Sequence, residues 1–387
     1  MADNKDKKVL NVPALRFPEF SGEWEKCVLT EIVERVTRRN KGNVCKLPLT
    51  ISAQYGLVDQ ITFFNKVIAS ADMSNYYLLT KGDFAYNKSY SSEYPWGAIK
   101  RLDRYEYGAL SSLYICFRPL SHVSSDFLMH YFETKKWHQG VSEIAVEGAR
   151  NHGLLNIGIQ DFFATSHYMP QELSEQKKIA AFLNLIEKRI SVQNKIIEDL
   201  KKLKSAIYQE MFGSLVAQTL KLGQVAEVVK GKQVNGTELL EQGAYYVMNG
   251  GTLPSGWLNK YNTEANTISI SEGGNSCGYV QYNTSPYWSG GHCYSLKILH
   301  PQETSDLYLY HFLKWQEENI MALRIGSGLP NIQKKDLLHF PVILPTITQQ
   351  NKIVLILSAI EEKVSCEISI TQYFVKQKEY LLSQLFI

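Results

Sequence analysis

The sequence predicts an α+β chain made of two tandem strand-rich units, each followed by one long helix, with the two helices paired. Three observations carry this prediction: a helical segment that occurs twice, apolar residues spaced three and four apart along both copies, and alternating strand-like stretches before each copy. The expected segments are residues 1–168 and 213–344 for the strand-rich units, and residues 169–212 and 345–387 for the helices.

The duplication extends well beyond the helix. LSEQKKIAAFLNLIEKRI at residues 173–190 returns as ITQQNKIVLILSAIEEKV at residues 347–364, which is 174 positions later. Three upstream segments repeat in the same order: GLLNIGIQDF (153–162) with GLPNIQKKDL (328–337), SDFLMHYF (125–132) with SDLYLYHF (305–312), and LTEIVERV (29–36) with LGQVAEVV (222–229). A repeat of this period indicates that one structural unit occurs twice.

The apolar spacing makes a narrow seam of coiled-coil type along each predicted helix. Gln193 and Glu367 occupy equivalent positions in this seam, where a polar residue fixes the register of pairing. The alternative is that each helix packs only on its own unit. About forty residues without Pro or Gly favour pairing, because such a helix is about 60 Å long. The predicted pairing residues are Ile179, Leu183, Ile186, Ile190, Ile197 and Leu200 in the first helix, and Ile353, Leu357, Ile360, Val364, Phe374 and Leu381 in the second.

The segments before the helices predict sheets with a few short helices. TISIS (267–271) and YSLKI (294–298) alternate in the manner of strands, and Gly250-Gly251 and Gly273-Gly274 mark turns. Pro170 and Pro345 precede the long helices and separate them from the preceding strands.

Composition predicts an ordinary globular protein of the cytoplasm. The net charge is +3, which permits a polyanionic partner without requiring one. The N-terminal residues lack the apolar core of a secretory signal, and no stretch reaches the roughly 18 apolar residues of a membrane span. The six scattered cysteines form no C-x-x-C pair and are expected to be reduced.

No catalytic motif is apparent in the sequence. It contains no phosphate loop, no H-E-x-x-H metal motif and no G-x-S-x-G elbow. Ser285-Pro286-Tyr287-Trp288 matches the proline-containing site of amino-methyltransferases only weakly, and His292-Cys293 is expected to be a satisfied structural pair. We therefore predict a protein that is not an enzyme and that holds no metal or cofactor of its own.

A set of polar, cationic and aromatic residues is instead suited to DNA. Such side chains hydrogen-bond to base edges, bind phosphates and pack on sugars. Each member taken alone could equally be a solvated loop residue, so the prediction rests on the set. It comprises Lys88, Ser89, Tyr90, Ser91, Lys100, Arg101 and Arg104 in the first unit, and Asn249, Lys260, Asn275, Ser276, Gln281 and Arg324 in the second.

The duplicated layout resembles the specificity (S) subunit of type I restriction–modification enzymes over essentially the whole chain. The matching motifs are RFPEF-S-G-E-W (16–24), GDFAYNKSYS (82–91) with YPWGAIKRL (94–102), and P-x-x-x-x-E-Q-x-x-I (170–179). The second copy departs from the last motif, since Pro345 to Ile353 is one residue shorter and Gln349-Gln350 replaces Glu175-Gln176.

The resemblance implies a division of labour. Each strand-rich unit would be a target recognition domain that reads half of a bipartite site in double-stranded DNA, and the two helices would pair antiparallel as a spacer. Two methyltransferase (M) subunits would dock on the helices and restriction (R) subunits would join them. S-adenosylmethionine, ATP and Mg²⁺ would then be bound by these partners. Two rivals remain: a repeat protein that binds proteins or glycans, and an unrecognised nuclease or methyltransferase.

Overall fold

The computed structural model describes residues 10–145, 155–326 and 328–387. Gly153 and Leu154 of the repeat lie outside these residues. Contacts divide the chain into unit 1, Met1–Val192 with Ile370–Ile387, and unit 2, Gln193–Ser369. Within the described ranges, no helix has the length and apolar character needed to cross a membrane.

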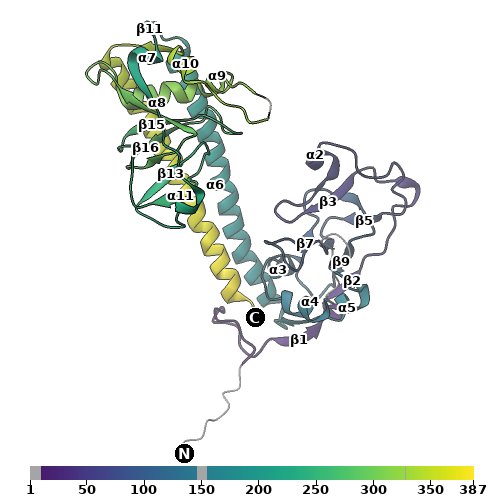
Figure 1. Cartoon of the computed structure of the whole chain (residues 1–387). Helices are drawn as coiled ribbons and strands as arrows, with labels where there is room; N and C mark the ends of the chain where they lie inside the picture. The colour runs from purple at the N-terminus through teal and green to yellow at the C-terminus, as the bar shows by residue number, and fades with distance from the viewer. Residues whose placement is uncertain (1–9, 146–154, 327) are drawn as a thin grey trace, which may run out of the picture. The chain divides into compact units, whose positions relative to one another are not determined.

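Unit 1 contains two four-stranded sheets and a two-stranded ribbon (Figure 1). The strand orders are β2-β9-β6-β7 and β4-β3-β8-β5, and β1 pairs with β10. Neighbouring strands are antiparallel except β3 and β8, which are parallel. The strands are β1 (Glu25–Val28), β2 (Val33–Arg35), β3 (Pro48–Ser52), β4 (Gly56–Asp59), β5 (Tyr77–Thr80), β6 (Phe84–Asn87), β7 (Ala98–Arg101), β8 (Tyr107–Leu110), β9 (Ile115–Pro119) and β10 (Ser166–Met169).

Two hydrophobic cores hold unit 1 together. The larger core packs the sheet that contains β6 and β9 against short helices and against the ends of both long helices. The smaller core fills the space around β3, β4 and β8, and none of its residues belongs to a long helix. The short helices of this unit are α1 (Leu29–Ile32), α2 (Gln60–Phe64), α3 (Ser125–Tyr131), α4 (His138–Ile144) and α5 (Ile159–Phe163), with one 3-10 turn, Lys41–Asn43.

Unit 2 repeats this plan with different sheets. Its four-stranded sheet has the order β12-β18-β15-β16, a three-stranded sheet has the order β14-β13-β17, and β11 pairs with β19. The predicted strands TISIS and YSLKI are confirmed as β15 and as part of β18. The strands are β11 (Gln218–Lys221), β12 (Ala226–Lys230), β13 (Tyr245–Met248), β14 (Trp257–Leu258), β15 (Thr267–Ser271), β16 (Val280–Asn283), β17 (Trp288–Ser289), β18 (Cys293–Ile298) and β19 (Pro341–Leu344).

The main core of unit 2 joins its four-stranded sheet to short helices and to two long-helix segments. Phe212 of the first segment and Leu357 of the second are buried in this core, and their burial stabilises the packing of both helices on the unit. The short helices are α7 (Leu222–Val225), α8 (Asp306–Trp315), α9 (Glu317–Met321) and α10 (Lys334–Leu338), with one 3-10 turn, Gly236–Glu238.

Two long helices are the structural elements that the sequence predicted most clearly. Helix α6 spans Leu173–Gly213 and helix α11 spans Ile347–Leu385. Each begins two or three residues after the expected proline, Pro170 or Pro345. Each helix starts in the core of one unit and ends in the core of the other: Leu183 and Phe212 of α6 are buried in units 1 and 2, respectively.

The sequence repeat corresponds to equivalent structure. Residues 29–36 form α1 and β2, and residues 222–229 form α7 and β12. Both short helices are capped in the same way, since Glu31 accepts from the backbone of Val28 (2.7 Å) and Gln224 accepts from that of Lys221 (2.8 Å). The duplication therefore includes local capping chemistry as well as the chain path.

One part of the repeat requires correction by one residue. Ser124 caps α3 and Ser305 caps α8, each accepting from the backbone nitrogen three residues on at 3.3 Å. Residue 305 is thus equivalent to 124, whereas the aligned segments 125–132 and 305–312 paired it with 125. Two adjacent serines, Ser124 and Ser125, stand at the start of α3, and residue identity alone does not show which one caps the helix. The corrected register superimposes His130 on His311, and both are fully buried.

Candidate nucleic-acid interface and helix pair

The first predicted DNA-binding stretch, residues 88–91, follows strand β6 as a loop. Ser89, Tyr90 and Ser91 are exposed, with Tyr90 58% accessible. Lys88 is half-buried, and its ammonium donates to the carbonyl of Ile157 at 3.4 Å. Ser89, Tyr90 and Ser91 therefore face solvent, while Lys88 links the loop to the repeated segment 153–162.

Three further predicted cations of unit 1 differ in their surroundings. Arg101 is 12% exposed and forms ion pairs with Asp103 (2.7 Å) and Asp126 (2.6 Å). Lys100 is half-buried on β7, and burial lowers its pKa. Arg104 is exposed in the bend that follows. A phosphate contact by Arg101 would have to compete with its two carboxylates, whereas Arg104 already faces solvent.

Three predicted residues of unit 2, Asn249, Asn275 and Ser276, lie in two glycine-rich loops that the fold brings together. The hydroxyl of Ser271 donates to the carbonyl of Gly250 at 2.7 Å, so the loop of Asn249 lies beside the turn that carries Asn275. Asn249 accepts from the backbone of His292 at 3.0 Å. A Cβ on Gly290 would lie 2.5 Å from Oδ1 of Asn249, which explains glycine there. Asn275 is exposed and Ser276 is half-buried.

The remaining predicted residues of unit 2 lie on separate elements. Lys260 is exposed, with its ammonium 5.2 Å from the centre of the Trp288 ring. Gln281 lies half-buried on β16 and donates to Asn283 at 3.4 Å. Arg324 is exposed just after α9. None of these placements tests a base or phosphate contact, so the DNA-binding set stays a prediction.

Half of the helix-pairing residues lie in unit 1, where the start of α6 meets the end of α11. Lys378 of α11 forms ion pairs with Glu187 of α6 and with Glu133, the latter at 2.9 Å. Arg189 lies 5.2 Å from the ring centre of Phe374. Among the pairing residues, Ile179, Leu183, Ile186 and Leu381 are buried, and Ile190 and Phe374 are half-buried.

The other half lies in unit 2, where the end of α6 meets the start of α11. Gln193 hydrogen-bonds to Glu367, and Lys204 pairs with Glu361 at 2.5 Å. Since the contact on α11 moves back from 367 to 361 as that on α6 advances from 193 to 204, the pairing is antiparallel. Here Ile353 and Leu357 are buried, and Ile197, Leu200, Ile360 and Val364 are half-buried.

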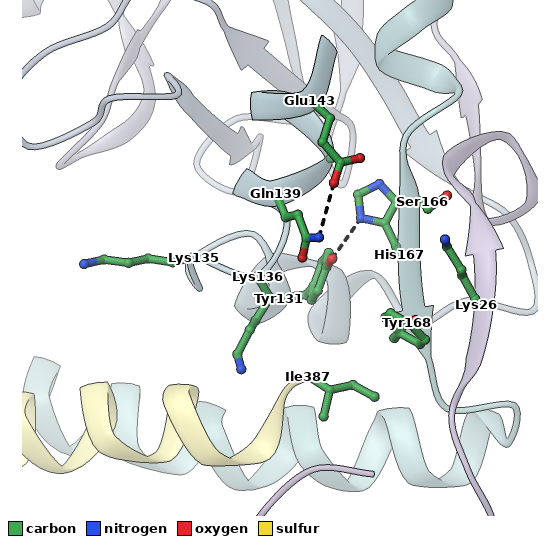
Figure 2. A pocket seen from close by; sticks show the side chains of 11 residues that line it. Lys26, Tyr131, Lys135, Lys136, Gln139, Glu143, Ser166, His167, Tyr168 and Ile387 are labelled. Carbon is green, nitrogen blue, oxygen red and sulfur yellow. Dashed lines mark hydrogen bonds between the residues drawn. The ribbon is translucent and has the colours of Figure 1, made fainter. Parts of the chain in front are cut away.

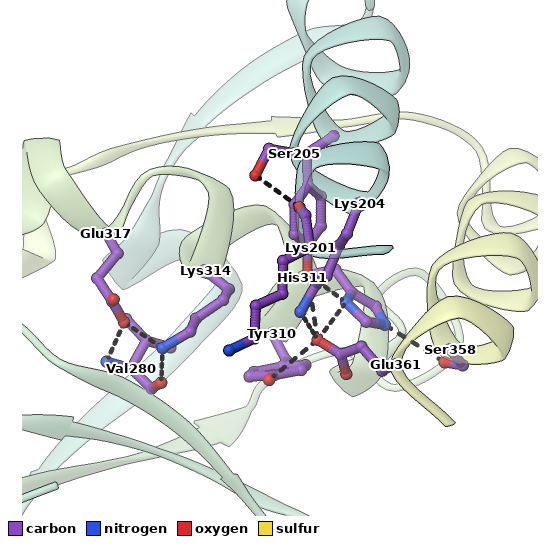
Figure 3. A network of polar contacts seen from close by, with 11 residues as sticks. Lys201, Lys204, Ser205, Val280, Tyr310, His311, Lys314, Glu317, Ser358 and Glu361 are labelled. Atoms are coloured by element: carbon purple, nitrogen blue, oxygen red, sulfur yellow. Dashed lines mark hydrogen bonds and ion pairs between the residues drawn. The ribbon is translucent and has the colours of Figure 1, made fainter. Parts of the chain in front are cut away.

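The ion pairs of the two helices are related by the repeat. Lys204 and Lys378 are 174 positions apart, and so are Glu187 and Glu361. Figure 3 shows the unit 2 version, in which Glu361 also accepts from Tyr310 at 3.4 Å and lies beside His311. Each unit thus holds the end of one helix against the start of the other with the same lysine–glutamate chemistry.

Each unit contains a buried glutamine that recurs in both copies of the repeat. The sequence showed the recurrence but did not predict the hydrogen bonds that these side chains make. Gln176 accepts from the backbone of Ser124 (2.8 Å) and donates to the carbonyl of Pro170 (3.0 Å). Gln350 accepts from Ser305 (2.8 Å) and donates to Pro345 (2.8 Å). Each amide therefore joins three elements: the long helix, the preceding strand exit and the cap of a short helix.

The RFPEF-S-G-E-W motif serves a structural purpose. The guanidinium of Arg16 makes two contacts of 2.8 Å to the carboxylate of Glu175, which is 2% exposed, and Trp24 donates to the same carboxylate at 3.2 Å. Gln349 stands in the place of Glu175 in the second copy, and its side chain instead accepts a hydrogen bond from the backbone of Thr346 at 3.3 Å. The departure from the motif therefore removes a buried ion pair from one helix start only.

One group of side chains in the described residues has the spacing of a metal site. Atoms of His130, Glu133 and Glu187 lie within 4.8 Å of one another. The ammonium of Lys378 contacts both carboxylates. Burial alone would raise the pKa of Glu133, but the contacts with His130 and Lys378 lower it to about 2. The cluster is an ion-pair network in which the lysine supplies the positive charge.

A cavity of about 400 Å³ in unit 1 has a histidine in its wall (Figure 2). Nδ1 of His167 accepts from Tyr131 (2.8 Å), and Nε2 donates to Thr165 (2.8 Å), whose own hydroxyl donates to Phe162. Burial lowers the pKa of His167 to about 4. Because both ring nitrogens are occupied and the ring is neutral, His167 is not placed to take a proton from a substrate.

The His292-Cys293 pair is also structural. Cys293 is buried on β18, and burial raises the pKa of its thiol to about 11. His292 is 60% exposed on its side chain and lies near Glu272, at 4.0 Å. A thiol with a raised pKa is a poor nucleophile, so this pair lacks the chemistry of a catalytic dyad.

Comparison with known proteins places unit 2 in a family. Residues 217–372 match the type I restriction modification DNA specificity domain. A Mycoplasma pneumoniae protein named as a type I specificity subunit is 37% identical over 144 residues, or 37% of this chain and 38% of its own length. A second such protein, from Mycoplasma genitalium, is 31% identical over 161 residues, or 41% of this chain and 42% of its own length. The matched regions span about two fifths of these relatives.

The fold extends the match over the whole chain. The crystal structure of the type I restriction-modification system S subunit from M. genitalium has a TM-score of 0.64 and 18% identity, and it covers 97% of this chain and 99% of its own. At that identity the comparison shows the fold alone. Residues 217–372 thus match a type I restriction modification DNA specificity domain by sequence, and the chain as a whole has the fold of that S subunit.

Proposed function

We propose that this chain is the DNA-recognition subunit of a type I restriction–modification complex. In this proposal each unit reads one half of a bipartite site in double-stranded DNA, and the chain itself catalyses nothing. Two M subunits and the R subunits supply the chemistry in the cytoplasm, where they bind S-adenosylmethionine, ATP and Mg²⁺. The rivals, a protein- or glycan-binding repeat module and an unrecognised enzyme, draw no comparable support from the fold or the family.

The observation that carries the proposal is the duplicated helix pair. Lys204–Glu361 in unit 2 and Lys378–Glu187 in unit 1 are the same contact made twice, as are the amide contacts of Gln176 and Gln350. A chain with two equivalent helical surfaces is suited to binding two copies of one partner. The sheets differ between the units, as expected if each reads a different half-site.

The charge and length of the chain are consistent with this role. A net charge of +3 is modest for a protein that grips DNA alone, so the M subunits are expected to provide much of the phosphate contact. Each long helix is about 60 Å in length at 1.5 Å per residue. A stiff pair of that length would set the gap between half-sites geometrically.

The first test is recovery of the tagged chain from its own cytoplasm, with identification of the proteins that accompany it. A methyltransferase at about two copies per chain is the expected result, and its presence would lead to mapping methylated sites across the genome. Recovery of the chain with unrelated proteins, or with none, would contradict the proposal. The salt dependence of binding distinguishes DNA binding from glycan binding, because the affinity for DNA should fall steeply between about 50 and 200 mM salt.

A further inference from the structure

Unit 1 carries an exposed apolar surface for which its fold gives no internal partner. It consists of Tyr55, Ile61, Phe63, Phe64, Val67 and Ile68, here called the apolar tip, on and around α2 (Figure 1). The chain has sixteen phenylalanines, and Phe63 and Phe64 are the two that are exposed, at 44% and 43%. Concentrated exposure of this kind marks an interaction site more often than isolated apolar residues do.

The apolar tip has a defined conformation. Asp59 caps α2, accepting from the backbone of Ile61 at 3.0 Å and from the hydroxyl of Thr62 at 2.5 Å. Asn65 ends the helix in the left-handed region, with φ of 50°. The rings of Phe63 and Phe64 meet edge to face, with centroids 4.9 Å apart. The aromatic side chains are therefore held at a short, capped turn.

The chain segment that contains the apolar tip is basic. Residues 38–76 carry five cations and two carboxylates, a net charge of +3 that equals the net charge of the whole chain. The two carboxylates are already engaged, since Asp59 caps α2 and Asp72 accepts from the backbone of Ser74 at 2.9 Å. The cations are Arg38, Arg39, Lys41, Lys46 and Lys66, and all five are exposed. Arg38 and Arg39 also donate to the carbonyls of Leu78 and Asn75.

Hydrogen bonds join residues 38–43 to the segment that follows the apolar tip. Asn43 donates to the carbonyl of Ala71 at 3.2 Å, and the backbone of Leu78 donates to that of Arg38 at 2.8 Å. Gln54 and Asn65 add exposed amides. The surface thus combines phenylalanines, amides and cations, which is the composition of DNA-binding proteins that insert apolar side chains between base steps.

The apolar tip also lies apart from the helix pair. It stands on the smaller core of unit 1, which includes Leu57 and Leu102 and contains no residue of α6 or α11. In unit 1 the two long helices pack in the larger core instead. Charge and placement therefore favour DNA over a protein partner.

We propose that Phe63 and Phe64 act as a wedge that enters a base step of the half-site read by unit 1 and locally unstacks it. The inference rests on the proposed DNA-recognition function. The distortion is placed in the half-site read by unit 1, because Phe63 and Phe64 belong to that unit. The expected cost of unstacking, a few kcal/mol, would be offset by contacts of the surrounding cations with phosphates.

The test uses the full chain in complex with its M subunits and a duplex that carries the mapped target. 2-Aminopurine replaces one base at a time in each half-site, with the methylated base left out. The wild-type complex should raise the fluorescence several-fold at one step of the unit 1 half-site. The Phe63→Ala/Phe64→Ala variant should lose at least four fifths of that rise and bind about tenfold more weakly, which is about 1.4 kcal/mol.

Two control variants separate the effect of the phenylalanines from general effects of surface mutation and of charge. Leu113→Ala removes an apolar side chain that is 77% exposed and lies outside the apolar tip, so it should change nothing. Lys46→Ala/Lys66→Ala should reduce the salt dependence of binding, by about one unit of slope for each phosphate that is no longer bound, and keep the fluorescence step.

Three results would overturn the wedge. The fluorescence step could persist in the double phenylalanine variant, or be missing from the wild-type complex although it binds its target. The variant could instead release its M subunits, which would make the apolar tip a protein-docking surface. If the wild-type complex binds no bipartite duplex at all, the proposed function fails first and the wedge fails with it.

Discussion

Gln193 of α6 and Glu367 of α11 hydrogen-bond to each other, and they are 174 positions apart, the same offset that relates the two copies of the long helix. Each residue is therefore the repeat equivalent of its own partner. Such a contact lies at the centre of the antiparallel pairing, where one register satisfies both polar side chains. A polar pair buried in an apolar seam disfavours other registers, since slippage would leave both groups without partners.

Removing either buried glutamine should destabilise the unit whose cap it holds. Gln176→Ala deletes hydrogen bonds to Ser124 and Pro170, and the buried groups left unpaired cost about 1–3 kcal/mol each. We expect a loss of about 2–4 kcal/mol, measured by urea denaturation, and a similar loss for Gln350→Ala. Gln377→Ala, at an exposed position of α11, is the control. Equal stability of all three variants would show that the amides do not hold the caps.

The stability of unit 1 should depend on an arginine at position 16. Arg16→Ala leaves the carboxylate of Glu175 buried with one donor, Trp24, and should cost about 3–5 kcal/mol in unit 1. Arg16→Lys should recover only part of this, because an ammonium cannot reproduce the two parallel contacts of the guanidinium. Thermal denaturation of the three proteins tests the order. Full recovery by lysine would mean that charge alone is needed.

Acid should weaken both units through their buried histidines. The pKa of His167 and of His311 is lowered to about 4, chiefly by burial, from an ordinary value near 6.5. The unfolded chain therefore binds more protons between about pH 6.5 and 4, and stability falls as the pH falls through that window. At pH 5.5 the loss is about 1.4 kcal/mol for each histidine relative to pH 8.

The low pKa of Glu133 acts in a different window, since its stabilisation is lost only below about pH 4.5. The difference between the urea midpoints at pH 8.0 and pH 5.5 should therefore report the protonation of the two histidines and not that of Glu133. His167→Gln should remove about half of the difference between the two midpoints. A wild-type midpoint that does not change with pH would contradict the neutral, buried state of these rings.

Under the proposed function, lengthening the helix pair should widen the gap between the two half-sites. Seven residues inserted after Val192 in α6 and seven after Ser369 in α11 keep the Gln193–Glu367 contact and the seam period. The insertion adds about 10 Å, which corresponds to at most about three base pairs. Methylation mapping reads the new target. A gap that does not change would mean that the helices are not the spacer, and a seven-residue insertion in α6 alone should fail to assemble.

Under the proposed function, exchanging residues 1–168 for the corresponding segment of a related two-unit protein should alter one half of the target and leave the other half unchanged. The physical reason is that each sheet system has its own core, so side chains of one unit are positioned independently of the other. Sequencing of methylated sites checks the outcome. A change in both halves would contradict modular reading.

The predictable part of this protein was the part fixed by periodicity and repetition. Both long helices, their seam and the strands TISIS and YSLKI follow from spacing, because side-chain burial at 3.6- and 2-residue periods is a local property. The wrong register at α3 and α8 came from adjacent serines, which spacing does not distinguish. The ion pair of Arg101 with Asp126 was beyond prediction, because Asp126 is distant in sequence and only the fold brings it near.

The candidate site shows the same limit. The sequence identified polar loops such as residues 88–91 but overlooked Phe63 and Phe64, which read as ordinary core residues. Apolar residues are usually buried, and only the structure shows that this short helix projects them outward. The repeat did provide a signal for Gln176 and Gln350, since a glutamine kept in both copies within an apolar stretch indicates a specific contact.

The sharing of the long helices between units imposes an order on synthesis. The larger core of unit 1 includes Leu381, Leu382, Leu385 and Phe386, and all four are translated after the whole of unit 2. While the ribosome is still making unit 2, unit 1 exposes the apolar groove that these residues will fill. The nascent chain must therefore keep its first unit incomplete, or shielded by other proteins, until α11 has emerged, and this interval is when the protein is most open to aggregation and proteolysis.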